Sequence, residues 1–293
     1  MNLSEVASSF KSCTGEAHRS FKDYLISLSI SKEDIEKGIV ISDCANYILR
    51  DIELLLSKAI INLCAADLLI KRGYFHWGFV TSYYSSFYSV QALNRLMLNF
   101  YTWTKSGVIC KVTNYAKQEL SIMYSNSSGG SHEAQFEKFY ENYSAFKHKK
   151  SIDRYWTIGL RNFKHRPETV LRNDINYSIE KEYYYELTLD ERTFRRIIGD
   201  NKTCLPGEQL IIKTPINYSL PHLELSLSRI RITLYILNYI ANAQPIYYGY
   251  YVHRNNERKQ NIDLKYPHLS QWIKDRLYEW LQFVEHETDD ILV

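Results

Sequence analysis

The most regular pattern of hydrophobic positions in the chain lies between residues 43 and 72. Apolar residues recur there at spacings of three and four, which places them on one face of a helix. This face consists of Ala45, Leu49, Ile52, Leu56, Ala59, Leu63, Ala66 and Ile70. Asp43 is expected to cap the start of this helix, and Gly73 is expected to end it. The pattern predicts a long amphipathic helix whose apolar face contacts a core.

The following segment, residues 74–100, carries two stripes at helical spacing. Small residues form the first stripe: Gly78, Ser82, Ser85, Ser89 and Ala92. Bulky residues form the second stripe: Trp77, Thr81, Tyr84 and Tyr88. A stripe of small side chains lets another helix approach closely. Because only a short break at Gly73 separates the two segments, they are predicted to form an antiparallel helical hairpin.

Proline usage distinguishes the two halves of the chain. All six prolines lie after residue 166, and proline disrupts helix interiors. Further helices are predicted near 15–29, 113–123, 132–147, 222–243 and 267–287, and short strands near 108–112, 209–214 and 246–252. The predicted fold is mainly α: a helical bundle over 1–166, followed over 167–293 by a C-terminal helical extension with a small β element.

Composition narrows the function only slightly. The net charge of +3 is too small to indicate nucleic-acid binding, and the 25 tyrosines suit cores, interfaces and base stacking alike. The five cysteines are widely spaced without a Cys-x-x-Cys motif, which favours a reduced, cytoplasmic compartment. No apolar run is long enough to span a bilayer, and the N-terminus lacks the basic start and apolar run of a signal peptide. We therefore predict a cytoplasmic protein without membrane association.

A basic segment between residues 147 and 172 is the strongest charge feature. Eight Lys and Arg residues stand there against two acidic residues, a local net charge of +6, with aromatic residues interleaved. Cations neutralise phosphates and aromatic rings stack on bases, so the composition suits RNA or single-stranded DNA. The predicted nucleic-acid-binding residues are Lys147, His148, Lys149, Lys150, Arg154, Lys164 and Arg166. The alternative is a solvated segment that pairs with acidic residues elsewhere.

Arg161 and His165 form the candidate catalytic pair within this segment. Residues four apart share one face of a helix. The Arg would stabilise charge that develops on a phosphodiester, and the His would move a proton to or from a ribose hydroxyl. The alternative is that His165 only caps or bridges. We predict no metal and no cofactor, because the histidines lack metal-ligand spacing and nucleotide-binding motifs are absent.

Six residues of the segment after Gly73 carry a family resemblance: Phe79, Tyr83, Tyr84, Phe87, Ala92 and Leu93. Together with the preceding long helix, this pattern resembles the HEPN superfamily of prokaryotic helical domains over roughly residues 43–166. The resemblance implies a helical bundle that often dimerises. It also implies a place in toxin–antitoxin or anti-phage systems, frequently with an RNA target and with a protein partner from the same operon.

Catalytic HEPN members cut RNA without metal, using an Arg and a His separated by four to six residues. Arg161 and His165 are separated by three, and the family also contains members that only bind or assemble. The leading hypothesis is a cytoplasmic bacterial defence component that binds RNA or a partner protein, as a homodimer or in a hetero-complex. The alternatives are a metal-independent endoribonuclease and a purely structural assembly subunit.

Overall fold

A computed structural model describes residues 2–104, 107–125, 132–145, 172, 212–213, 217–218 and 222–285. This part of the chain contains nine helices, a four-stranded antiparallel sheet and a separate two-stranded pair. The prediction of a mainly α fold with a small β element is therefore confirmed.

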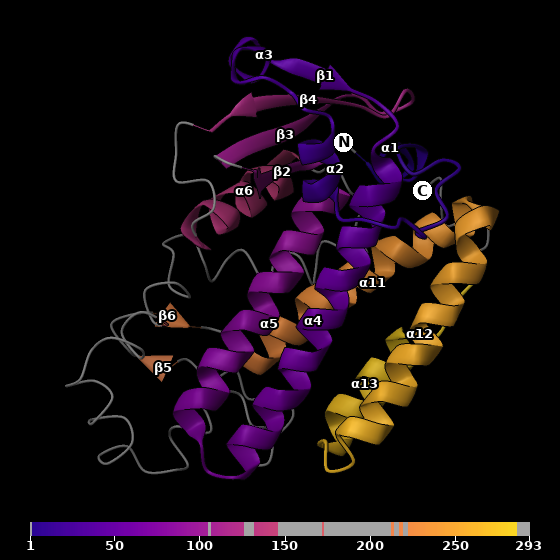
Figure 1. Cartoon of the computed structure of the whole chain (residues 1–293). Helices are drawn as coiled ribbons and strands as arrows, with labels where there is room; N and C mark the ends of the chain where they lie inside the picture. Colours follow the sequence, from indigo (N-terminus) through magenta and orange to yellow (C-terminus); the bar gives the residue numbers. More distant parts are fainter. Residues whose placement is uncertain are drawn as a thin grey trace.

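Two long helices, α4 (Ala45–Lys71) and α5 (Phe75–Leu96), form an antiparallel hairpin at the centre of the molecule, as predicted (Figure 1). The predicted apolar face of α4 is buried along its whole length. Gly73 turns the chain with a φ of +85°, in the left-handed region that glycine adopts without strain. The expectation that Asp43 caps α4 is wrong, because Cys44 occupies the cap position and makes no side-chain hydrogen bond there.

The small-residue stripe of α5 faces other helices, which confirms its predicted role. A Cβ atom on Gly78 would lie 2.6 Å from Cγ1 of Ile70, so α4 and α5 approach too closely there for a larger residue. The Ser85 hydroxyl donates a 2.8 Å hydrogen bond to the Ala59 carbonyl of α4. Small side chains and satisfied hydroxyls thus hold this interface together.

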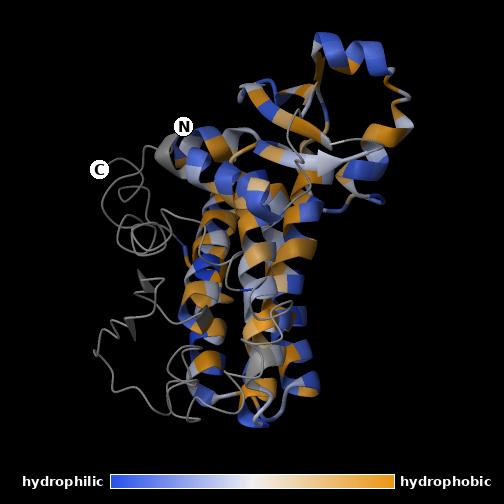
Figure 2. Ribbon diagram, turned by 90° about the vertical axis from the view of Figure 1, so that its left-hand side faces the viewer, coloured by the Kyte–Doolittle hydropathy of each residue, from blue (hydrophilic) through white to orange (hydrophobic). Residues whose placement is uncertain are grey.

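A third long helix, α11 (His222–Ala243), packs against both members of the hairpin and against α1 (Leu3–Ser8). Its apolar residues belong to the same hydrophobic cluster as those of α4 and α5. Figure 2 shows apolar and polar residues distributed along these helices in patches, as expected for helices with one face toward a shared core. The predicted helix 222–243 is confirmed, and the predicted domain boundary near residue 166 stays a prediction.

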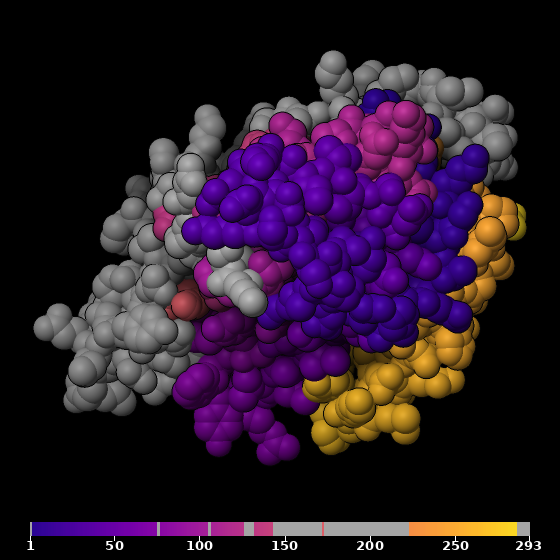
Figure 3. All heavy atoms as spheres, turned by 45° about the horizontal axis from the view of Figure 1, so that its top comes forward, coloured from indigo at the N-terminus to yellow at the C-terminus, as the bar shows by residue number. Residues whose placement is uncertain are grey.

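The sheet lies at one end of the hairpin, with strands in the order β1 (Ile39–Ile41), β4 (Glu119–Tyr124), β3 (Gly107–Asn114) and β2 (Asn99–Trp103). All neighbouring strands are antiparallel. Together with the short helices α2 (Phe21–Ser27) and α3 (Lys32–Lys37), the sheet covers this end of the molecule (Figure 3). Of the predicted helix 15–29, only the part that forms α2 is helical in the structure.

The predicted strand 108–112 is confirmed within β3, but the predicted helix 113–123 is wrong. Strands β3 and β4 form a hairpin across that segment, and Leu120 and Ile122 are buried while Met123 is exposed. This alternation is the period-two pattern of a strand with one buried face. The backbone N–H and C=O groups of β4 form their hydrogen bonds with β3 and β1. In a helix, the same groups would have bonded to one another within the segment.

Helix α6 (His132–Ala145) confirms the helix predicted at 132–147 and covers the edge strand β2. The Asn142 amide donates hydrogen bonds to the carbonyl of Asn99 at 2.8 Å and to Oδ1 of Asn94 at 2.9 Å. The Gln135 amide donates to the carbonyl of Tyr101 at 3.5 Å. These side chains satisfy edge carbonyls that would otherwise invite pairing with another strand.

The C-terminal part departs from prediction in the segment 246–252, which was expected to be a strand. It lies inside the helix α12 (Pro245–Lys265), where Tyr247 and Tyr251, four residues apart, are both buried. Aromatic residues favour strands in isolation, but their spacing here suits a buried helical face. The predicted helix 267–287 is shorter in the structure, as α13 (Gln271–Trp280). The predicted strand 209–214 is represented by β5 (Ile212–Lys213), which pairs with β6 (Asn217–Tyr218).

Candidate functional site

The residues predicted from sequence to carry chemistry lie outside the described part of the chain. This applies to the candidate catalytic pair, Arg161 and His165. It also applies to the predicted nucleic-acid-binding residues Lys147, His148, Lys149, Lys150, Arg154, Lys164 and Arg166. Their roles, and the assembly alternative, stay predictions. The structure does describe Arg172, the last cation of the basic segment 147–172.

Arg172 lies beside helix α5, in a cluster with Tyr83, Phe87 and His132. Its guanidinium carbon is 5.6 Å from the centre of the Tyr83 ring, within range of a cation–π contact. The Tyr83 hydroxyl and Nδ1 of His132 share a 2.7 Å hydrogen bond. The His132 ring stacks on Phe87 with centroids 4.0 Å apart and planes 5° apart. We call these four residues the α5–α6 cluster, because α5 and the first residue of α6 supply three of them.

His132 is held in its neutral form by this cluster. Burial lowers the pKa of His132 to about 4, and the nearby charge of Arg172 adds to the effect. An imidazole with so low a pKa is not an imidazolium at neutral pH, so it is a poor general acid, and it is also a weak general base. The cluster is therefore better suited to positioning and binding than to proton transfer.

A row of aromatic side chains extends along the outer side of α5, next to the cluster. Trp77 has 60% of its surface exposed, and Tyr84 and Tyr88 are half-buried. We call these three residues the aromatic stripe. The Tyr84 and His132 rings meet edge-to-face at 5.7 Å, which joins the stripe to the α5–α6 cluster. The stripe also contacts a cation, because the Lys58 ammonium lies 5.5 Å from the centre of the Tyr88 ring.

Sequence reasoning identified the aromatic stripe as a feature of the helix but did not connect it with function. It also treated the basic segment as separate from the hairpin. Of the basic segment's cations the structure describes Arg172 alone, and Arg172 contacts Tyr83 of the hairpin although 89 positions separate them. The signal in the sequence was the bulky stripe itself, because Trp77, Tyr84 and Tyr88 recur at helical spacing on one face of the helix.

Other chemistry finds little support in the residues that the structure describes. Within the described ranges, no group of three or more His, Cys, Asp or Glu side chains is arranged to hold a metal ion. The four described cysteines are buried and free, and burial raises the pKa of the Cys13, Cys44 and Cys64 thiols to about 12. Such thiols stay protonated and unreactive. None of the helices seen in the described ranges is long and apolar enough to cross a membrane.

Comparisons with known proteins add no relative. No protein-family model, no curated protein and no solved structure matches this chain. The case for a function therefore rests on the aromatic stripe, on the α5–α6 cluster with its Arg172, and on the composition of the basic segment.

Proposed function

We propose that this protein is an RNA-binding component of a bacterial defence or conflict system. The supporting observation is that Arg172, the end of the basic segment 147–172, lies against the same helix that presents the aromatic stripe. Aromatic rings and cations on one surface supply the two interactions that bind single-stranded nucleic acid without sequence preference. The defence context is supported by the HEPN-like pattern in the same helix.

In this proposal the bases of a single strand stack on the aromatic stripe while cations bind the backbone. Trp77 and Tyr88 are eleven residues apart on α5, which corresponds to about 16 Å along the helix. Lys58 at the Tyr88 ring and Arg172 at Tyr83, whose ring meets that of Tyr84, supply positive charge for the phosphates. The neutral His132 holds Tyr83 and packs against Tyr84, so it shapes the surface without acting in catalysis.

Binding of a labelled single-stranded RNA, followed by fluorescence anisotropy, tests the proposal. Trp77→Ala removes the most exposed stacking ring of the stripe and is expected to weaken binding about 5- to 150-fold, the range for one lost base–aromatic stack of roughly 1–3 kcal/mol. Trp103→Ala is the matched control, because Trp103 is 49% exposed but lies on β2. Equal affinities of the two variants and the parent would count against the stripe.

The basic segment is tested separately through the dependence of binding on salt. Replacing Lys149, Lys150 and Arg154 together by Gln removes three cations, so the slope of log affinity against log salt is expected to fall by about 2 for a single strand. A triple variant with the parental affinity and slope would show that the segment is not the site. Light scattering of the same samples tests the expected homodimer or hetero-complex.

A further inference from the structure

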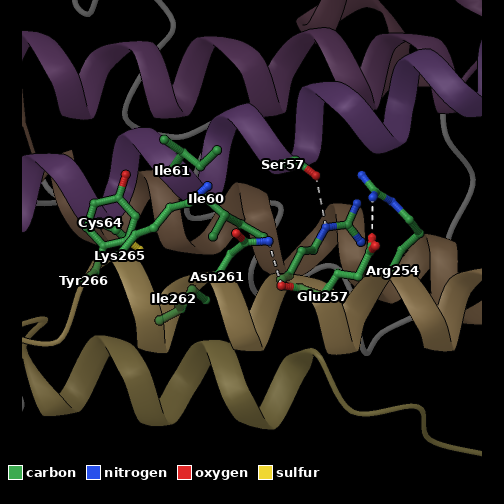
Figure 4. A pocket seen from close by; sticks show the side chains of 11 residues that line it. Ser57, Ile60, Ile61, Cys64, Arg254, Glu257, Asn261, Ile262, Lys265 and Tyr266 are labelled. Atoms are coloured by element: carbon green, nitrogen blue, oxygen red, sulfur yellow. Dashed lines mark hydrogen bonds and ion pairs between the residues drawn. The ribbon is translucent and has the colours of Figure 1, made fainter.

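A cleft of about 210 Å³ lies between helices α4 and α12. Figure 4 shows it running along the two helices, with Ser57, Arg254 and Glu257 toward one end and Lys265 and Tyr266 toward the other. Isoleucines from both helices line the space between these ends: Ile60, Ile61 and Ile262. The middle of the cleft is therefore largely apolar, with Asn261 as a polar residue among the isoleucines, and its ends are polar.

Two buried carboxylates of α4 explain why the helices enclose a cleft here. Glu53 accepts hydrogen bonds from the Tyr247 hydroxyl and the Arg258 guanidinium, both from α12. Asp67 accepts from the backbone N–H of Ser270 at 2.8 Å and from its hydroxyl at 2.6 Å, just before α13 begins. The two carboxylates are fourteen residues apart, or about 21 Å along α4. They hold the C-terminal helices at two points, and the cleft lies between those points.

Charge is balanced at one end of the cleft and unbalanced at the other. Arg258 is paired with Glu53, and Arg254 is paired with Glu257. Lys265, in contrast, forms no ion pair or hydrogen bond with any residue that the structure describes. Next to it, the Tyr266 hydroxyl is protonated at neutral pH, as an ordinary tyrosine hydroxyl is, and burial raises its pKa further. This end offers one positive charge and one neutral donor.

We propose that the cleft binds a small aliphatic carboxylate, with its chain against the isoleucines and its carboxylate at Lys265 and Tyr266. One unbalanced cation matches one negative charge, which favours a carboxylate over a doubly charged phosphate. The volume is below the roughly 300–1,000 Å³ of sites for drug-sized ligands, so the ligand is short. This inference does not depend on RNA binding, because no residue of the aromatic stripe or of the α5–α6 cluster lines the cleft.

Isothermal titration of the full chain with octanoate, butanoate and octylamine tests the inference. Octanoate is expected to bind with a stoichiometry of one, butanoate more weakly because its chain is short, and octylamine not at all because its charge is positive. Equal binding of octanoate and octylamine would overturn the proposal, as would binding of several octanoate molecules per chain.

Two variants locate the ligand. Lys265→Gln is expected to weaken octanoate binding at least tenfold, whereas Lys117→Gln, which removes an exposed lysine between β3 and β4, is expected to leave it unchanged. Ile61→Trp places a large ring at the mouth of the cleft and is expected to abolish binding. Ile61 is 45% exposed, so this variant is expected to fold, with an unchanged far-ultraviolet circular dichroism spectrum as the check. Parental affinity in both Lys265→Gln and Ile61→Trp would overturn the proposal.

Discussion

The two sides of α4 hold their neighbouring helices by opposite means. Toward α5, small side chains let the helices approach until a Cβ on Gly78 would collide with Ile70, and hydroxyls such as that of Ser85 bond to backbone carbonyls. Toward α12 and α13, the buried carboxylates of Glu53 and Asp67 make the contacts. The first interface is close-packed, whereas the second encloses a cleft.

This difference determines how each interface fails when a residue changes. A close-packed interface of small side chains is sensitive to added volume, because a larger side chain forces the helices apart. An interface built on a buried ion pair is most sensitive to loss of one partner, because the other is left charged and buried. Small side chains thus give the α4–α5 interface its close packing, and the buried carboxylates leave room for a ligand between α4 and α12.

The largest expected effect is on the buried ion pair. Glu53→Ala leaves the Arg258 guanidinium, which is only 5% exposed, without its carboxylate. Loss of one partner of such a pair costs about 3–5 kcal/mol of the free energy of unfolding. Urea unfolding followed by circular dichroism measures the change.

Removing both partners is the control for this prediction. A double variant, Glu53→Leu with Arg258→Met, keeps apolar volume without either charge and is expected to recover most of the lost stability. If Glu53→Ala alone leaves the unfolding midpoint at its parental value, buried charge does not hold α12 to α4.

The next effect is on the close-packed interface. Ser85→Leu or Ser89→Leu adds volume where both side chains are fully buried and is expected to cost about 1–3 kcal/mol as overpacking. Thr81→Leu on the outer side of the same helix is the matched control and is expected to change stability by less than about 0.5 kcal/mol. Unchanged melting temperatures in both serine variants would contradict the role of the small-residue stripe.

A smaller effect is expected at the second carboxylate. Asp67→Asn keeps an oxygen acceptor for Ser270 but removes the charge that strengthens both hydrogen bonds and the 3.2 Å contact with Lys71. We expect a loss of about 1–2 kcal/mol in urea unfolding. Asp263→Asn, at an exposed ion pair with Lys274, is the comparison and is expected to cost at most about 1 kcal/mol. Equal losses would show that burial of Asp67 adds nothing.

The last effect concerns α6, which packs against α5, and it depends on pH. The pKa of His132 is about 4 in the folded protein, below the value of roughly 6.5 expected when unfolded. Between these values the unfolded chain binds more protons, so stability rises with pH from about 4 to about 6.5 and this contribution is constant outside that window.

The prediction is checked by comparing urea midpoints across this pH window in the parent and in His132→Gln. Part of the pH dependence is expected to disappear in the variant, because its side chain does not titrate. Identical pH profiles for the two proteins would mean that His132 is not held neutral by the α5–α6 cluster.

Much of the helical framework was predictable because it depends on neighbours along the chain. The three-and-four spacing of apolar residues defined α4, and the small residues from Gly78 to Ala92 defined the packed side of α5. Where the same local reasoning failed, long-range pairing decided the outcome. Residues 113–123 became strands because β3, β4 and β1 pair with one another, and Tyr247 and Tyr251 became part of a helix because their rings are buried against the core.

The candidate sites show the same division more strongly. The sequence by itself determined that one helix carries a bulky aromatic stripe and that a basic segment follows it, because both are local patterns. Only the tertiary structure placed Arg172 beside Tyr83, and Arg258 beside Glu53 across 205 positions. Such pairs form when segments distant in sequence pack side by side. Their identity depends on which faces meet, and no local spacing along the chain contains that information.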